Sequence, residues 1–204
     1  MSGVYVEHLA LPPYNRPEIL RYSGAKEADP QLEALLNSCL AEAEGTIQGR
    51  VCYAEFPISA GENGLDLGFT TTASRLLQTR LAECQRLVLF AATIGVELDR
   101  LITRYARLSP ARALLFQAIG AERIEALCDA FEAAVQSRCR KGGEQVVGRV
   151  SPGYGDIPLA MQQAIFTALD CSRKIGLSLN DSLLMSPTKS VTAIIGIQKS
   201  DGNI

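Results

Sequence analysis

The stretch Arg-Leu-Val-Leu-Phe-Ala-Ala-Thr-Ile at residues 86–94 is almost continuously apolar and ends at Gly95. A short apolar run that a glycine interrupts is typical of a buried strand. A second run of this kind, Val-Thr-Ala-Ile-Ile-Gly-Ile, occupies residues 191–197. The sequence therefore predicts two buried strands that lie far apart along the chain.

Helical periodicity fills much of the chain between and before these strands. The longest predicted helix begins at Ser109-Pro110, a favourable cap and first residue, and ends at Gly142-Gly143. Small residues within it, Ala118, Gly120 and Ala121, allow close packing on a neighbour. Further helices are predicted over residues 16–22, 29–44 and 96–108, and from residue 72 or 73, where Leu77, Leu81, Cys84 and Val88 follow at helical steps.

The remaining segments alternate between extended and helical patterns. Strands are predicted over residues 49–57 and 65–69, joined by a Gly-Glu-Asn-Gly turn at 61–64, and over residues 145–150. After a loop at residues 151–156, a helix with Pro158 near its start is predicted to run to Gly176. This mixture of strands and helices indicates one α/β or α+β domain.

The first thirty residues differ from the rest because they are rich in proline. Within the chain of 204 residues we find no internal repeat, linker or low-complexity segment. We therefore predict an N-terminal arm over residues 1–30, packed on a body over residues 31–204, in a single domain overall.

Charge and composition exclude several classes of protein. Twenty Lys and Arg against 22 Asp and Glu give a net charge of −2, which disfavours nucleic acid or an anionic membrane as a partner. No apolar run approaches the length of a membrane span. The six cysteines lack metal-type spacing and the only histidine is His8, so we predict no metal site and a reducing, cytoplasmic location.

The motifs of common enzymes are also missing. The sequence contains no G-x-S-x-G, H-E-x-x-H, P-loop or strand-followed G-x-G-x-x-G pattern. No catalytic residue is assigned on this basis.

The most unusual local stretch is Arg-Val-Ser-Pro-Gly-Tyr-Gly-Asp-Ile-Pro at residues 149–158, between a predicted strand and a predicted helix. Glycines on both sides of Tyr154 let the backbone approach a ligand, and the guanidinium of Arg149 can hold a carboxylate with two hydrogen bonds. The alternative is a Pro-Gly turn with the tyrosine packed beneath it and a solvated arginine.

This stretch, followed by Leu-Ser-Leu-Asn-Asp-Ser-Leu-Leu-Met-Ser-Pro-Thr-Lys-Ser-Val-Thr-Ala-Ile-Ile-Gly-Ile at residues 177–197, resembles the activation (reactivation) domain of vitamin B12-dependent methionine synthase. That family carries R-x-x-P-G-Y-x-x-C-P and, later, L-T-E-S-x-x-M-x-P-x-x-S-V-S, in the same order and at similar spacing. The resemblance covers about residues 144–197. The middle of the chain is similar to free-standing versions of this domain.

The resemblance implies an α+β fold with a mainly antiparallel twisted sheet and packed helices. It also implies a protein that binds S-adenosylmethionine and supports the reductive methylation of cob(II)alamin carried by a partner. The expected partners are the cobalamin-binding domain of methionine synthase or a related corrinoid protein, with a flavodoxin-like electron donor as a further candidate. The chain would then be a component of the synthase that acts in reactivation, rather than a stand-alone enzyme.

The resemblance assigns the ligand contacts residue by residue. Arg149 matches the arginine expected to bind the ligand carboxylate, Tyr154 matches the tyrosine beside the ligand, and the Val150 backbone lies where the family contacts adenine. The full expected binding segment is Arg149, Val150, Ser151, Pro152, Gly153, Tyr154 and Gly155.

The chain departs from the family pattern at several positions. Ile157 replaces the motif cysteine, Leu179-Asn180-Asp181-Ser182 replaces L-T-E-S, and Ala193-Ile194-Ile195 stands where the synthase form has aromatic residues. The acidic partner expected in the N-terminal region for the ligand ammonium group is not identified. The acidic residues Glu122, Glu125 and Asp129 are candidates for such contacts.

Two other functions remain open at this point. The chain is alternatively an interaction module that caps a corrinoid protein without binding S-adenosylmethionine, or a S-adenosylmethionine-dependent helper of another corrinoid methyltransferase. Methyl transfer from a sulfonium to a cobalt nucleophile needs no general base, so a chain with one histidine is compatible with the activity implied by the resemblance.

Overall fold

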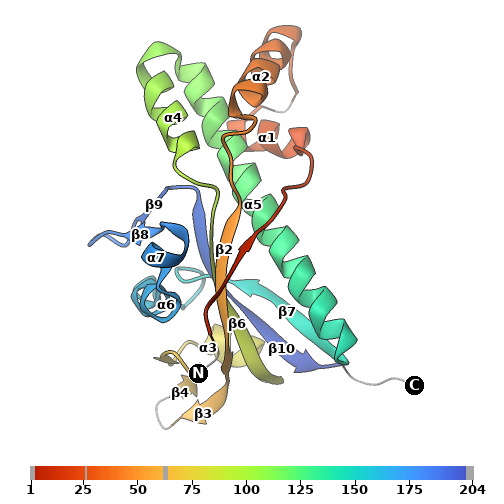
Figure 1. Cartoon of the computed structure of the whole chain (residues 1–204), viewed down its shortest axis with the longest axis vertical. Coiled ribbons are helices and arrows are strands. Elements are labelled where there is room, and N and C mark those ends of the chain that lie inside the picture. Colours follow the sequence, from red (N-terminus) through yellow and green to blue (C-terminus); the bar gives the residue numbers. More distant parts are fainter. Residues whose placement is uncertain (1–2, 26, 62–63, 201–204) are drawn as a thin grey trace.

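A central antiparallel sheet organises the molecule. The computed structural model describes residues 3–25, 27–61 and 64–200, and within them this sheet has five strands (Figure 1). In spatial order the strands are β1 (Tyr5–His8), β2 (Arg50–Pro57), β6 (Cys84–Thr93), β10 (Ser190–Lys199) and β7 (Glu144–Val150). The two apolar runs of the sequence are the neighbouring strands β6 and β10, and Phe90 pairs with Ala193.

Strand β6 is buried on both faces of the sheet. Val88 and Phe90 point into one hydrophobic core, whereas Leu87 and Leu89 point into a second core on the opposite face. Successive side chains of a strand alternate between faces, so burial on both faces requires an uninterrupted apolar run. This explains why the sequence of β6 shows no polar alternation.

Helices cover both faces and create the two cores. Helices α1, α2, α4 and α5 contribute to the first core, and α3, α6 and α7 contribute to the second. Their bounds are α1 (Arg16–Ser23), α2 (Pro30–Ala43), α3 (Arg75–Arg80), α4 (Glu97–Leu108), α5 (Pro110–Lys141), α6 (Met161–Leu169) and α7 (Cys171–Ile175).

Helix α5 is the longest element, with 32 residues, and spans most of the long axis of the molecule (Figure 1). At 1.5 Å per residue its length is about 48 Å. A Cβ atom at Gly120 would lie only 2.5 Å from Leu98 Cδ2 of α4, so the glycine lets the two helices approach closely. The prediction that small residues serve close packing here is confirmed.

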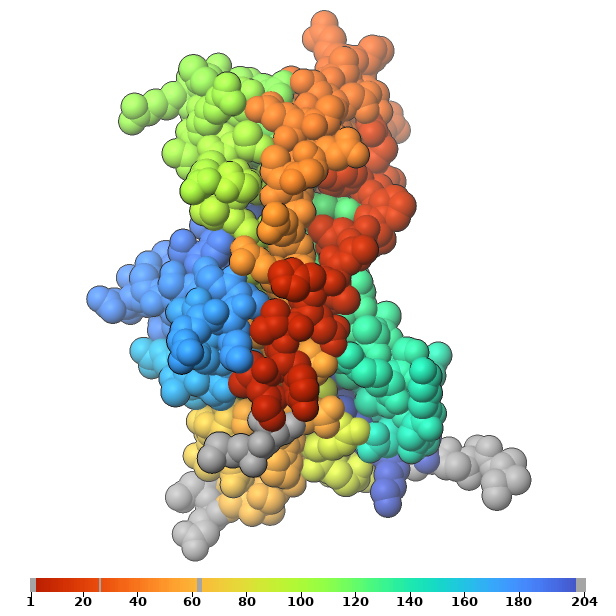
Figure 2. Space-filling view, viewed as in Figure 1, coloured from red at the N-terminus to blue at the C-terminus, as the bar shows by residue number. Residues whose placement is uncertain are grey.

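The N-terminal segment contributes to both the sheet and the first core. Strand β1 pairs with β2, with His8 opposite Arg50, and α1 packs on α5 through the buried side chain of Ile19. In Figure 2 this segment, in red, lies along the surface of the molecule. The division into an arm and a body stays a prediction.

Short strands complete the fold at two sites on the periphery. Strands β3 (Ser59–Gly61), β4 (Gly64–Asp66) and β5 (Thr71–Thr72) form one small sheet, and β8 (Ser178–Leu179) and β9 (Met185–Ser186) form a hairpin. The turn predicted at residues 61–64 includes residues 62–63, which lie outside the described residues.

The predicted α+β class with a mainly antiparallel sheet and packed helices is confirmed, but three element bounds are wrong. The helix expected to continue through Cys84 and Val88 ends at Arg80, because both residues belong to β6. The strand expected over residues 65–69 ends at Asp66. The helix expected from Pro158 begins at Met161 and is broken at Asp170, whose φ of 49° is left-handed.

Phe131→Ala should strongly destabilise the protein. The fully buried ring packs on Phe90 and Tyr53, with ring centroids 4.9 Å and 5.1 Å away. Its removal leaves a cavity in the first core and should lower the free energy of unfolding by about 3–5 kcal/mol, measured by urea denaturation. Leu108→Ala, at a side chain that is 70% exposed, is the control and should stay within about 0.5 kcal/mol of the wild type.

Candidate functional site

Two edge strands bring distant segments to the same end of the sheet. Neighbouring strands are antiparallel throughout, so β1 and β7, at opposite edges, run in the same direction. The chain leaves β1 at residue 9 and leaves β7 at residue 151, and α5 lies on the sheet face between the two edges. The arm lies along α5, on which α1 packs, whereas the loop that follows β7 contacts the start of α3 in the opposite helical layer.

Arg149, the motif arginine, is bound to three carboxylates of α5. Its Nη1 lies 2.7 Å from Asp129 Oδ1 and 2.8 Å from Glu132 Oε2, and its Nη2 lies 2.8 Å from Glu125 Oε2. Positions three and four residues apart share one face of a helix, which is why the three acids converge on one guanidinium. The side chain of Arg149 is 22% exposed, so the alternative of a solvated surface arginine is wrong.

The charge of Arg149 is strongly stabilised by this arrangement. Partial burial opposes the charged form, but the hydrogen bonds to Asp129 and Glu132 outweigh it and raise the pKa of Arg149. Three carboxylates face one guanidinium, so the cluster of Glu125, Asp129, Glu132 and Arg149 carries a net charge of −2. It favours cationic groups in its surroundings.

The loop after β7 forms two tight turns. Gly153 (φ 87°) and Gly155 (φ 58°) both adopt left-handed backbone conformations. The Gly153 N–H donates to the Ile157 carbonyl, and the Tyr154 N–H donates to the Ser151 carbonyl. Gly155 also packs closely, because a Cβ there would lie 2.8 Å from Leu76 Cδ2. The positive φ favours glycine at this position, and a larger residue would also require the Leu76 side chain to move.

Asp156 fixes this loop to the start of α3. Its carboxylate accepts hydrogen bonds from Ser74 Oγ at 2.5 Å and from the Arg75 N–H at 2.7 Å. The hydrogen bond from Ser74, followed by that from the Arg75 backbone, lowers the pKa of Asp156 below its usual value. The loop is therefore held in place by an ionised carboxylate.

The predicted binding residues are placed differently with respect to solvent. Val150, paired with Ile194, and Pro152 are buried, whereas Gly153, Tyr154 and Gly155 are exposed. Tyr154 is 63% exposed, so the alternative that it packs beneath a structural turn is wrong. The ring is free to contact a ligand or a partner.

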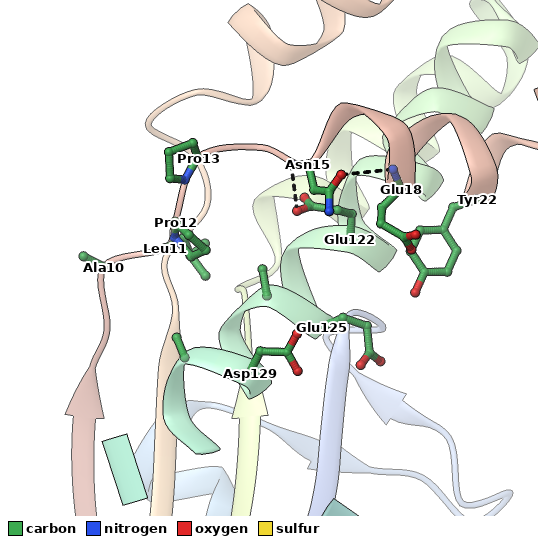
Figure 3. A pocket seen from close by; sticks show the side chains of 12 residues that line it. Ala10, Leu11, Pro12, Pro13, Asn15, Glu18, Tyr22, Glu122, Glu125 and Asp129 are labelled. Atoms are coloured by element: carbon green, nitrogen blue, oxygen red, sulfur yellow. Dashed lines mark hydrogen bonds between the residues drawn. The ribbon is translucent and has the colours of Figure 1, made fainter. Parts of the chain in front are cut away.

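A cavity between the N-terminal segment, α1 and α5 lies over the outer face of α5. It has a volume of about 740 Å³, within the range of small-molecule sites, and is mainly apolar with acidic side chains in its wall. Figure 3 shows its two sides. The arm and α1 supply Ala10, Leu11, Pro12, Pro13, Asn15, Glu18 and Tyr22, and α5 supplies Glu122, Glu125, Ala126, Asp129 and Ala130.

The cavity and the Arg149 cluster share two residues. Glu125 and Asp129 line the cavity and also bind Arg149. In Figure 3 the two acids lie one turn apart on α5, across from Glu18 and Tyr22 of α1. Residues 149–155 do not line the cavity themselves, so Arg149 reaches its edge only through these two carboxylates.

Glu122, the third candidate acid, has a structural role. Its carboxylate accepts from the Asn15 N–H at 3.1 Å and from the guanidinium of Arg123, and both charged side chains are almost fully buried. Arg123 in turn donates to the Pro12 and Pro13 carbonyls and lies over the Tyr14 ring, 4.2 Å from its centroid. This buried pair attaches the arm to α5.

The sequence indicated Glu125 and Asp129 as candidate acids but did not place them around Arg149, and it gave no sign of Glu132 or of the cavity. The acids precede Arg149 by 17 to 24 residues, on a different element, and no local pattern links them. The one sequence feature that indicates an acidic cluster is the spacing of Glu125, Asp129 and Glu132, which places them on one helix face. A neighbouring arginine on another element could not be inferred from that spacing.

The cysteines, possible metal ligands and helices of the described residues were compared with what thiol chemistry, metal binding and membrane insertion require. All six cysteines are free and buried, and burial raises the pKa of Cys128 to about 12. Within residues 3–25, 27–61 and 64–200, no group of three or more His, Cys, Asp or Glu side chains is arranged to hold a metal ion. None of the helices described there combines the length and apolar character that crossing a bilayer requires.

Comparison with solved structures identifies the architecture. A crystal structure described as the MetH reactivation domain bound to AdoHcy matches 100% of this chain and 80% of that chain, with a TM-score of 0.71 and 16% sequence identity. The chain has the fold of the MetH reactivation domain. No protein-family model matches the sequence, and no curated protein matches it either. The resemblance found in the sequence is confirmed for the fold.

The departures from the reactivation-domain motifs have structural explanations here. Ile157, at the motif cysteine, is buried in the second core. Ala193, Ile194 and Ile195 are fully buried between the helical layers, so this part of β10 offers no side chain at the surface. Asn180 caps the β8–β9 connection, where its Oδ1 accepts from the Ser182 and Leu184 N–H groups.

Asp156→Ala should lower the melting temperature at neutral pH by releasing the loop from α3. Since folding lowers the pKa of this carboxyl, its stabilising effect is present above the usual value and is lost as the pH falls below about 4. The difference from the wild type should therefore narrow in acid, as measured by circular dichroism melts at pH 7 and pH 3. Asp181→Ala, at an exposed acid, is the control; a difference that stays constant with pH would contradict the assignment.

Proposed function

We propose that this protein binds S-adenosylmethionine and supports reductive methylation of cob(II)alamin carried by a methionine synthase or a related corrinoid protein. The single observation that carries the proposal is the position of Arg149. The arginine predicted from the motif lies at the edge of a ligand-sized cavity, in a chain with the fold of a reactivation domain that binds AdoHcy.

The cavity fits the ligand in size and in chemistry. Its volume of about 740 Å³ is sufficient for a nucleoside with an amino acid side arm. Apolar residues of the arm, such as Leu11 and Pro12, offer surface for a nucleoside, and the acidic wall favours a ligand with cationic groups. Arg149 would receive the carboxylate. Tyr154, on the loop that is held against α3 in the other helical layer, is proposed as a ligand contact outside the cavity.

The residues of this chain would bind and orient rather than catalyse. S-adenosylmethionine supplies a methyl group on a sulfonium and the partner's cobalamin supplies the nucleophile, so the transfer needs no general base. Holding two reactants in line contributes up to about 7–11 kcal/mol. The protein therefore acts as a component of a methyltransferase system and not as an enzyme by itself.

The proposed partners follow from the same function. The cobalamin-binding domain of methionine synthase or of a related corrinoid protein would dock where Tyr154 is exposed, and a flavodoxin-like protein is the candidate electron donor. We place the protein in the cytoplasm, since its six thiols are free and buried. Nucleic acid and membranes are not proposed as partners.

Arg149→Ala should weaken binding of S-adenosylmethionine. For the wild type we expect a micromolar dissociation constant by titration calorimetry. Loss of a charge-assisted bond of about 1.5–3 kcal/mol should weaken it by roughly 10- to 150-fold. Arg86→Ala is the matched control, because Arg86 also pairs with two carboxylates, Glu55 and Glu144, but lies away from the cavity.

The outcomes separate the alternative functions. If the wild type does not bind S-adenosylmethionine, the interaction module is favoured. An unchanged dissociation constant in folded Arg149→Ala would contradict the proposal that Arg149 binds the ligand carboxylate. A pull-down from cell extract, with the retained corrinoid protein identified, separates methionine synthase from another corrinoid methyltransferase.

Tyr154→Ala should weaken ligand binding without changing stability. The ring is 63% exposed and its loop is held by backbone hydrogen bonds, so the fold does not depend on it. We expect an unchanged melting temperature together with a higher dissociation constant. A fall in melting temperature with unchanged affinity would instead assign the tyrosine a structural role.

A further inference from the structure

We propose that Arg50 is the centre of an oxyanion site that binds a phosphate group, on the face of the sheet opposite to α5. Its guanidinium lies between the turns at Gly95 and Gly176, and the neighbouring strand adds His8. The proposal does not rest on the proposed function, because none of these residues lines the cavity over α5 or pairs with Arg149.

A row of polar residues crosses one end of the sheet. His8 of β1 lies opposite Arg50 of β2, and Arg50 in turn lies opposite Thr93 of β6. Thr93 lies opposite Ser190 of β10. Directly opposite residues of antiparallel strands share a face, and two residues further along β2 the same face enters the second core through Cys52. The row therefore closes the second core with polar side chains.

Arg50 is half-buried, yet its guanidinium has neither an ion pair nor a hydrogen bond among the described residues. Its Nε is shielded from solvent and has no acceptor there. The neighbouring hydroxyls of the row bond to each other instead, since Ser190 Oγ lies 2.9 Å from Thr93 Oγ1. Buried donors in folded proteins normally have an acceptor, so the missing partner of Arg50 points to a ligand.

The other arginines of limited exposure in the described part of the chain differ from Arg50 in this respect. Each of them pairs with a carboxylate of the protein. They are Arg16, Arg86, Arg112, Arg123 and Arg149. The guanidinium of Arg50 is equally charged, so a negative group from outside the chain would complete the same kind of pair.

Two glycine turns leave space beside the guanidinium. A Cβ atom at Gly95 would lie 3.8 Å from Arg50 Nη2, and a Cβ atom at Gly176 would lie 4.0 Å from Nη1. Any larger residue would therefore begin in contact with the guanidinium, whereas glycine keeps this space open. Both backbones are left-handed, with φ of 87° and 68°, which favours glycine. A small anion can approach Arg50 between the two turns.

The charges of the adjoining elements favour an anion at this position. Helix α7, which lies beside β2 in Figure 1, carries Lys174 in its last turn, two residues before Gly176. The acids of α4 and of the residue before α7 are engaged by other partners: Glu97 by Arg100, Asp99 by Thr188 and Asp170 by Arg173. A guanidinium, an imidazole and an ammonium group therefore surround one end of the sheet face, which suits a phosphate with two negative charges.

The test measures binding of inorganic phosphate to the full chain by titration calorimetry at constant ionic strength. We expect Arg50→Gln to weaken phosphate binding at least about tenfold, because a charge-assisted pair is lost. Arg50→Lys keeps the charge but loses the two-bond geometry, so its affinity should be intermediate. Arg107→Gln is the matched control at an exposed arginine and should bind as the wild type does.

A second measurement on the wild type covers the case in which the Arg50 variants do not fold. The Arg50 Nε–H resonance, assigned by nuclear magnetic resonance, should shift as phosphate is added and should saturate with the calorimetric dissociation constant. Shifts confined to other arginine side chains would place the phosphate elsewhere and overturn the proposal.

Two further probes define the ligand. If AMP binds more tightly than phosphate, and Arg50→Gln removes this binding, the site takes a phosphate ester; if only phosphate binds, it takes the free ion. Acetate should bind more weakly than either. Acetate binding as tight as that of phosphate, no binding of phosphate by the wild type, or an unchanged affinity in folded Arg50→Gln would each overturn the proposal.

Discussion

Burial of strand β6 on both faces is the constraint on which the rest of the structure depends. A strand with two apolar faces requires a helical layer on each side of the sheet, and the chain supplies both. Helices α1, α2, α4 and α5 form one layer, and α3, α6 and α7 form the other. Every element discussed at the candidate site lies where it does because it belongs to one of these layers or to an edge of the sheet.

The layer that contains α5 also creates the candidate site. One side of this helix is packed on the sheet, so its opposite side is left between the arm that follows β1 and the strand β7. Helical spacing places Glu122, Glu125 and Asp129 along that outer side. A single rigid element therefore carries the acids that attach the arm and those that bind Arg149. Their spacing does not depend on the conformation of a loop.

The sequence predicted the elements whose periodicity is long and unambiguous. The apolar run of β6 and the 32 residues of α5 were found because each pattern extends over the whole element. The error at α3 has a physical origin. Leu77, Leu81 and Cys84 all enter the second core, but Leu77 lies in α3, Leu81 directly follows α3, and Cys84 begins β6. Because the three side chains face the same core, their spacing resembles that of one continuous helix.

Only part of the candidate site was predictable, because the site combines one continuous motif with residues of distant elements. Arg149 and its loop belong to one continuous motif, so the sequence contains them together. The carboxylates that hold Arg149 lie on another element, and the cavity also requires the arm. The left-handed backbone at Asp170, with φ of 49°, likewise separates α6 from α7 without a glycine or proline in the sequence to mark the break. Contacts between distant elements carry no signal in a single sequence.

The buried pair of Glu122 and Arg123 has a consequence for proteolysis and for shortened forms of the chain. Arg123 depends on the carbonyl groups of Pro12 and Pro13, and Glu122 depends on the Asn15 N–H. Cleavage that released the first fifteen residues would leave these charged groups open to water on one side and without part of their hydrogen bonding. It would also remove the apolar wall of the cavity formed by Leu11, Pro12 and Pro13. A shortened chain that kept every helix would therefore lose both an anchor of α5 and one wall of the cavity.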